Sequence, residues 1–142
     1  MAVLLNLSGS QVFGTTPTLL SADLTPYMGI HRMVLVFPGN GPKEEAFLDQ
    51  WESAPVQSRM EHRSLLIFQV RDRDLIEKLR SSFAPKETGF RVWLIGLNGH
   101  LVFSTSHDVE AWEIFSRIDA LPGRQREIRQ HNDWDAGREV SP

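Results

Sequence analysis

The chain contains no cysteine among its 142 residues. Without thiols, a protein cannot form disulfide bonds, use a cysteine nucleophile or hold a metal through thiolates. This absence excludes every thiol oxidoreductase and thiol peroxidase mechanism, whatever the fold.

Long apolar segments are lacking as well. A membrane-spanning helix needs roughly 20 consecutive apolar residues, and no run in this sequence approaches that length. The opening MAVLLNLSGS has a short apolar run at residues 3–5 with no basic residue before it, which matches a signal peptide poorly. We therefore expect no membrane span and, for the chain as written, a cytoplasmic location. If the start is trimmed, a periplasmic or secreted location stays open.

Positive charge is in slight deficit. The chain has 15 Lys and Arg against 18 Asp and Glu, a net charge of −3, which argues against a dedicated nucleic-acid binder. Hydrophobic residues make up 41% of the chain, enough for a core, and the length suits one domain. We assign residues 21–129 to this domain, residues 1–20 to a loose lead-in, and residues 130–142, which include Trp134, to a polar tail.

Apolar patterning divides the domain into alternating strands and helices. Four apolar segments bounded by turn residues predict strands at residues 33–37, 65–70, 90–95 and 101–103. Three stretches with helical spacing predict helices: one begins near Pro42 and ends at Pro55, one follows Asp72 or Asp74, and one begins near Ser106 or Asp108. A short helical piece is also expected at residues 59–63, and a last turn or two at residues 124–129.

The order of these elements predicts a fold. A strand–helix–strand unit joins parallel strands by a right-handed crossover, whereas Asn98-Gly99 is a strong hairpin signal that makes the last two strands antiparallel. The result is an α/β domain with a mixed four-stranded sheet in the order 2-1-3-4 and helices on both faces. This is the order of elements in the thioredoxin-like fold.

Four short motifs are distributed along the domain. The longest is IDALPGRQREIR at residues 118–129. The others are Arg32 before the first strand, Arg63 before the second, and the hairpin GLNG at residues 96–99. This set, over about residues 20–130, resembles the domain-of-unknown-function family 4174, also called P-DUDES. The resemblance implies a thioredoxin-like fold related to peroxiredoxins and no established activity.

The loop after the first strand is one candidate site. Thioredoxin-like enzymes place a reactive thiol here, at the start of the next helix, but this chain reads PGNGPK at residues 38–43. Free N–H groups at the helix start, together with Gly39, Asn40, Gly41 and Lys43, suit a small anion. The alternative is an ordinary strand-to-helix turn, with Glu44 and Glu45 as acids of the first helical turn.

A second candidate site is the basic cluster of Arg124, Arg126 and Arg129, which lies beside Asp119 and Glu127. One interpretation is a contact site for an anionic ligand or a partner. The other is a set of ion pairs that fixes the last helix to the domain.

No cofactor or metal site is indicated. The five histidines, at positions 31, 62, 100, 107 and 131, show no ligand spacing, and no G-x-S-x-G motif is present. We therefore expect a non-redox binding or interaction module whose partner is a protein or a second copy of the chain. One alternative is an enzyme of unrecognised type that acts on a small anionic substrate near Asn40, Lys43 and a neighbouring arginine. Another is a structural domain that dimerises through a sheet edge or a helix.

Overall fold

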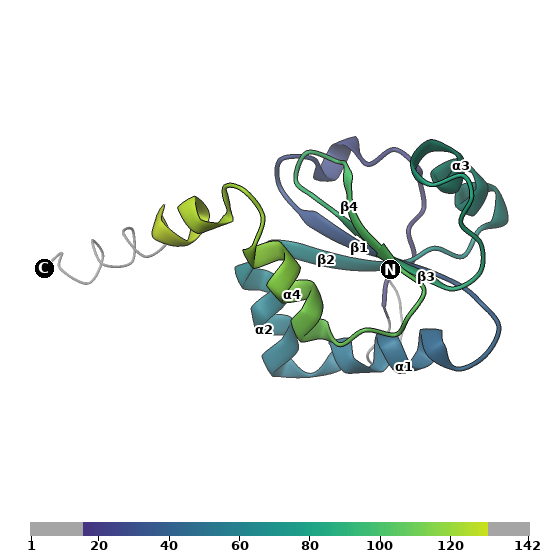
Figure 1. The fold of residues 1–142 in the computed structure, drawn as a ribbon, viewed down its shortest axis with the longest axis horizontal. Coiled ribbons are helices and arrows are strands. Elements are labelled where there is room, and N and C mark those ends of the chain that lie inside the picture. Colours follow the sequence, from purple (N-terminus) through teal and green to yellow (C-terminus); the bar gives the residue numbers. More distant parts are fainter. Residues whose placement is uncertain (1–15, 131–142) are drawn as a thin grey trace, which may run out of the picture.

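The computed structural model of the chain describes residues 16–130. Four strands form one mixed sheet in the order β2-β1-β3-β4 (Figure 1). Their bounds are β1 Arg32–Phe37, β2 Leu65–Gln69, β3 Arg91–Ile95 and β4 Leu101–Thr105. β1 is parallel to β2 and antiparallel to β3, and β4 is antiparallel to β3. The predicted α/β class and the strand order 2-1-3-4 are confirmed.

Helices cover both faces of this sheet (Figure 1). One face carries α1, the short 3-10 helix η2, α2 and α4, and the other carries α3 and the 3-10 helix η1. Their bounds are η1 Thr25–Tyr27, α1 Lys43–Asp49, η2 Gln50–Glu52, α2 Ala54–His62, α3 Arg73–Phe83 and α4 Ala111–Asp119. Residues 124–130 are also helical. This layering is consistent with the predicted thioredoxin-like architecture.

β1 lies at the centre of two apolar cores. Val34 and Val36 belong to the core under α1, α2 and α4, whereas Met33 and Leu35 belong to the core under α3. Successive residues of a strand point to opposite faces, so a strand covered on both sides needs an apolar residue at every position. The unbroken apolar run at residues 33–37 is explained in this way.

The prediction for Pro55 is wrong, because this residue begins a helix rather than ending one. α1 already stops at Asp49, and Pro55 lies in the first turn of α2. A proline is well suited to that position, where the first backbone N–H groups have no helical partner. The Ser53 hydroxyl caps this helix by accepting a hydrogen bond from the Val56 N–H at 3.4 Å.

The predicted start of α4 at Ser106 or Asp108 is also wrong, since the helix begins at Ala111. The reason is a long-range contact with Gln50 of η2. Its Oε1 accepts a hydrogen bond from the Ala111 N–H at 2.6 Å, and its Nε2 donates to the Val109 carbonyl at 2.9 Å. A side chain 61 positions earlier therefore caps the helix.

The hairpin between β3 and β4 forms at the predicted place. Gly99 has a φ of 81°, and the Asn98 side chain accepts a hydrogen bond from the His100 N–H at 3.0 Å. The pairing of β3 with β4 shifts register between Leu94 and Ile95, as at a β-bulge.

The described chain begins along the outer edge of β2. The Gln69 N–H donates to the Pro17 carbonyl at 2.9 Å, and the Leu19 N–H donates to the Gln69 carbonyl at 2.8 Å. These contacts fall within the segment predicted as a lead-in. The predicted tail begins at Gln130, which is helical, and the rest of it, with Trp134, lies outside the described residues. Within residues 16–130, no helix is long and apolar enough to cross a membrane.

Candidate functional site

The loop between β1 and α1 is shaped by packing. A Cβ atom on Gly39 would lie 2.6 Å from the Phe90 backbone nitrogen, so only glycine fits there without a shift. Gly41 has a φ of 103°, which disfavours other residues. Asn40 and Lys43 are exposed, and Lys43 Nζ donates to the Ser106 carbonyl at 3.4 Å. These two glycines are therefore explained without a ligand.

Carboxylates of α1 and η2 lie on one side of this loop. A cavity of about 290 Å³ beside the loop is lined by Gly41 and by Glu44, Glu45, Asp49 and Glu52. α1 has only seven residues, so its contribution to holding an anion is small, and the negative charges oppose one. The structure places Gly39, Asn40 and Gly41 on the loop and Lys43 at the first position of α1, and Gly41 borders the acidic cavity.

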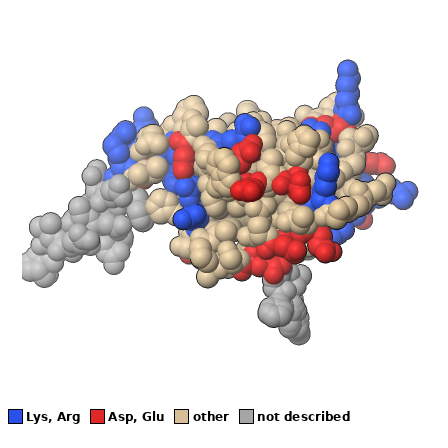
Figure 2. Space-filling model, turned by 60° about the horizontal axis from the view of Figure 1, so that its bottom comes forward, with Lys and Arg blue, Asp and Glu red and all other residues tan. Residues whose placement is uncertain are grey.

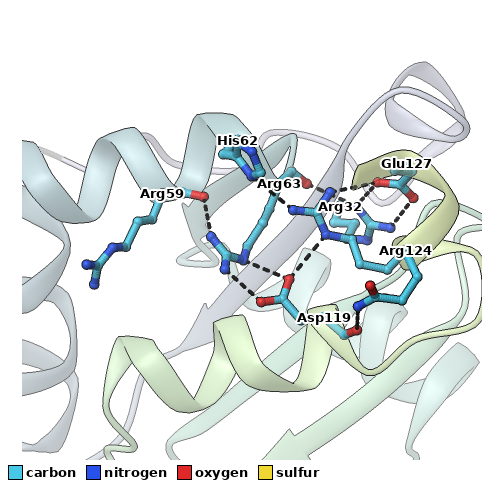
Figure 3. A network of polar contacts seen from close by, with 8 residues as sticks. Arg32, Arg59, His62, Arg63, Asp119, Arg124 and Glu127 are labelled. Atoms are coloured by element: carbon cyan, nitrogen blue, oxygen red, sulfur yellow. Dashed lines mark hydrogen bonds and ion pairs between the residues drawn. The ribbon is translucent and has the colours of Figure 1, made fainter. Parts of the chain in front are cut away.

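The C-terminal basic cluster, in contrast, joins a network that crosses the domain (Figure 3). Asp119 binds two arginines: Arg63 through Nε at 3.1 Å and NH2 at 2.7 Å, and Arg124 through Nε at 3.2 Å. Glu127 also binds two, Arg32 at 2.7 Å and Arg124 at 3.2 Å. Arg124 is thus shared between both carboxylates.

Backbone and imidazole groups complete this network. Arg32 donates to the Arg63 carbonyl at 3.0 Å, and Arg63 donates to the Arg59 carbonyl at 3.1 Å. The NH2 group of Arg124 lies 3.1 Å from Nδ1 of His62. The start of β1, the end of α2 and the end of α4 are thereby connected to the helical segment at residues 124–130.

Burial makes these ion pairs necessary. The side chains of Arg32 and Arg124 are only 3% and 4% exposed, and a buried guanidinium needs a counter-charge. Partial burial acts to raise the pKa values of Asp119 and Glu127. The hydrogen bonds and positive charges of their arginine partners outweigh burial, so both pKa values lie below the ordinary values.

The structure divides the predicted arginine cluster in two. Arg124 is buried in the network, as the ion-pair interpretation expects. Arg126 and Arg129 are exposed, and neither side chain makes a hydrogen bond or an ion pair with another described residue. Arg59 of α2 is exposed as well, and its guanidinium points away from the network (Figure 3).

A second polar cluster, around Glu87, was missed by the sequence analysis. The Glu87 carboxylate accepts hydrogen bonds from the Trp93 indole, the Ser104 hydroxyl and the Arg91 guanidinium, each at 2.6 Å. Burial acts to raise the pKa of Glu87, but these donors and the charge of Arg91 outweigh it and hold that pKa below its ordinary value. Glu87 follows α3 in a loop, so its spacing of four from Arg91 indicates no helical pair, and Ser104 of β4 is 17 positions away.

Metal binding has no support in the part of the chain that the structure describes. No group of three or more His, Asp or Glu side chains in residues 16–130 is arranged to hold an ion.

The sequence matches the model of one protein family. The model of a family described as Domain of unknown function (DUF4174) matches residues 23–127, whereas no curated protein matches the chain. The matched range contains most of the sheet-bound domain and all of the residues that form the arginine–carboxylate network. The motifs that carried the family resemblance, near Arg32, near Arg63 and from Asp119 to Glu127, therefore meet in space. The chain belongs to the DUF4174 family.

Proposed function

We propose that this domain is a non-redox interaction module that binds an acidic segment of a protein partner. The contact surface is the basic end, which consists of Arg59, Arg126 and Arg129. The observation that carries this proposal is a contrast within one group of arginines. Arg32, Arg63 and Arg124 are buried or half-buried, and the carboxylates of Asp119 and Glu127 neutralise them. The three arginines of the basic end are exposed, and their side chains form no ion pair with a described residue.

The position of the basic end suits recognition. In Figure 2, basic side chains gather at the end of the molecule where the described chain terminates. The buried network fixes residues 124–130 to β1 through Glu127 and to α2 through the contact of Arg124 with His62, so the exposed arginines project from a rigid support. A guanidinium binds a carboxylate through two parallel hydrogen bonds, which favours acidic side chains over neutral ones.

The alternative functions receive less support. An enzyme for a small anionic substrate would have to hold that anion near Asn40 and Lys43, on a loop whose Gly41 borders a cavity lined by four carboxylates of α1 and η2. A dimer through the β4 edge would have to accommodate the register shift at Leu94 and Ile95, and a bulge of this kind discourages pairing with another strand.

A binding titration tests the proposal. The probe is a fluorescent synthetic peptide in which Glu alternates with Gly. Replacing Arg59, Arg126 and Arg129 together with Gln should weaken binding about tenfold or more, because each exposed ion pair contributes up to about 1 kcal/mol. Binding should also weaken as added salt shortens the Debye length from about 10 Å toward about 3 Å.

The matched control is Arg73→Gln. Arg73 is also exposed, but it lies at the start of α3 on the opposite face of the sheet. Equal loss of affinity in this variant, no binding of the acidic peptide, or tighter binding of a DNA duplex than of the peptide would each overturn the proposal.

A further inference from the structure

A groove follows the outer edge of β2, on the side of the sheet covered by α1, η2 and α2. One cavity, of about 430 Å³, is lined by Trp51, Met60 and residues 65–67 of the strand. The cavity of about 290 Å³ at the start of α1 adjoins it, because Thr16 and Glu52 line both. Together they form a channel along the strand, and its wall carries five carboxylates, those of Glu44, Glu45, Asp49, Glu52 and Glu61. We call this channel the acidic groove.

The charge of the acidic groove is largely uncompensated. Glu44 faces Arg71 at 3.3 Å, but Glu45, Asp49, Glu52 and Glu61 make no ion pair with a described residue. Figure 2 shows acidic side chains gathered in the lower part of the face that it presents. Four adjacent carboxylates without cations favour a positively charged ligand.

Trp51, which lines the groove, carries an unsatisfied donor. Trp51 is 2% exposed, and its indole N–H lacks a hydrogen-bond acceptor in the described structure. The ring is held in place by Phe47 and Phe115, whose ring centroids lie 5.6 and 5.7 Å away. A buried donor without an acceptor is costly, so Trp51 leaves one hydrogen bond unfilled next to this end of the groove. Met60 and Ile67 add apolar surface at this end of the groove.

The strand edge offers further hydrogen bonds. Gln69 uses its outward N–H and carbonyl to bind Pro17 and Leu19. Because the direction of peptide groups alternates along a strand, those of Ile67 and Leu65 point the same way as those of Gln69, out from the edge of the sheet. No other described segment pairs with β2 at these two residues on that side. An extended peptide is the ligand shape that uses such groups.

We infer that the acidic groove binds an extended, basic segment of a protein partner. Lysine or arginine side chains of that segment pair with Glu45, Asp49 and Glu52. Its backbone bonds the edge of β2 near Ile67, and one apolar residue enters beside Trp51. This surface is separate from the basic end and does not depend on the function proposed for it.

The test uses the full chain and a synthetic peptide in which Lys alternates with Gly around one central Leu. Two-dimensional NMR of the isotope-labelled protein follows the Trp51 indole N–H, identified by its loss in Trp51→Phe. We expect this resonance and those of β2 to shift on titration. The triple variant Glu45→Gln, Asp49→Asn, Glu52→Gln should weaken binding about tenfold or more.

Two controls separate charge at the groove from charge in general. Glu77→Gln removes an exposed carboxylate of α3 on the opposite face and should leave the affinity unchanged. A peptide with Glu in place of each Lys should not shift the Trp51 resonance.

Three results would overturn the inference. They are no binding at millimolar peptide, equal weakening in Glu77→Gln, and shifts that follow protein concentration rather than added peptide. The last result would assign the groove to a second copy of the chain. Sedimentation velocity on the triple variant would identify that case by a loss of self-association.

Discussion

Oε2 of Glu127 lies 2.7 Å from NH2 of Arg32, although the two residues are 95 positions apart. Arg32 is the first residue of β1, the strand that pairs with both β2 and β3. Glu127 comes from the helical segment after α4. Because the Arg32 side chain is 3% exposed, its charge depends on this carboxylate. The segment at residues 124–130 is therefore part of the folded domain.

Neutralising Glu127 should destabilise the domain. Glu127→Gln leaves Arg32 and Arg124 with one carboxylate fewer, and we expect the free energy of unfolding to fall by about 1–3 kcal/mol. Urea denaturation at neutral pH measures this change. Glu113→Gln is the control, because Glu113 pairs with Arg117 at 3.4 Å on the exposed side of α4. That pair should contribute about 0.5 kcal/mol or less, and equal effects of the two substitutions would contradict the prediction.

The same network predicts how stability depends on pH. The pKa values of Asp119 and Glu127 are lower in the folded protein than their ordinary values of 3.8 and 4.5. A carboxylate with a lowered pKa stabilises the folded state fully above its ordinary value and loses that contribution as the pH falls through the folded value. Urea unfolding at a series of pH values should therefore show stability decreasing below about pH 4.5. The Glu127→Gln variant should show a shallower decrease, and parallel curves for the two proteins would refute this linkage.

The strands could be predicted from the sequence because their signals are local. The apolar run at residues 33–37 and the Asn98-Gly99 turn each act within a few positions. The start of α4 could not be predicted, since Gln50 caps it from another element. The same holds for the role of Arg124. The sequence shows that it neighbours Asp119 and Glu127, but not that Arg32 and Arg63 compete for those carboxylates.

The acidic groove escaped prediction for a similar reason. Glu44 and Glu45 were interpreted as acids of a first helical turn, and they do lie there. Their relation to Glu52 and Glu61 appears only when α1, η2 and α2 pack along the edge of β2. Spacing along the chain indicates which residues share a helix, but not which strand edge that helix borders.

Glu87 should stabilise the junction of α3, β3 and β4. Glu87→Gln removes the charge that Arg91 faces at 2.6 Å and weakens the acceptor for the Trp93 indole. We expect a loss of about 1–3 kcal/mol in the free energy of unfolding, together with a shift of the Trp93 indole N–H resonance. Glu77→Gln, on the exposed side of α3, serves as the control. A Trp93 resonance that stays in place in Glu87→Gln would show that the indole does not depend on this carboxylate.

Gly39 and Gly41 should respond to substitution for different reasons. Gly39→Ala places a Cβ 2.6 Å from the Phe90 backbone nitrogen, and we expect a loss of about 2–3 kcal/mol because the backbone itself must move. Gly41 has open space around its Cβ position but a φ of 103°, so Gly41→Ala should cost only about 1 kcal/mol of backbone strain. Thermal and urea unfolding of the two variants provide the comparison. If Gly39→Ala were the milder of the two, close packing against Phe90 would not be what requires glycine at the start of this loop.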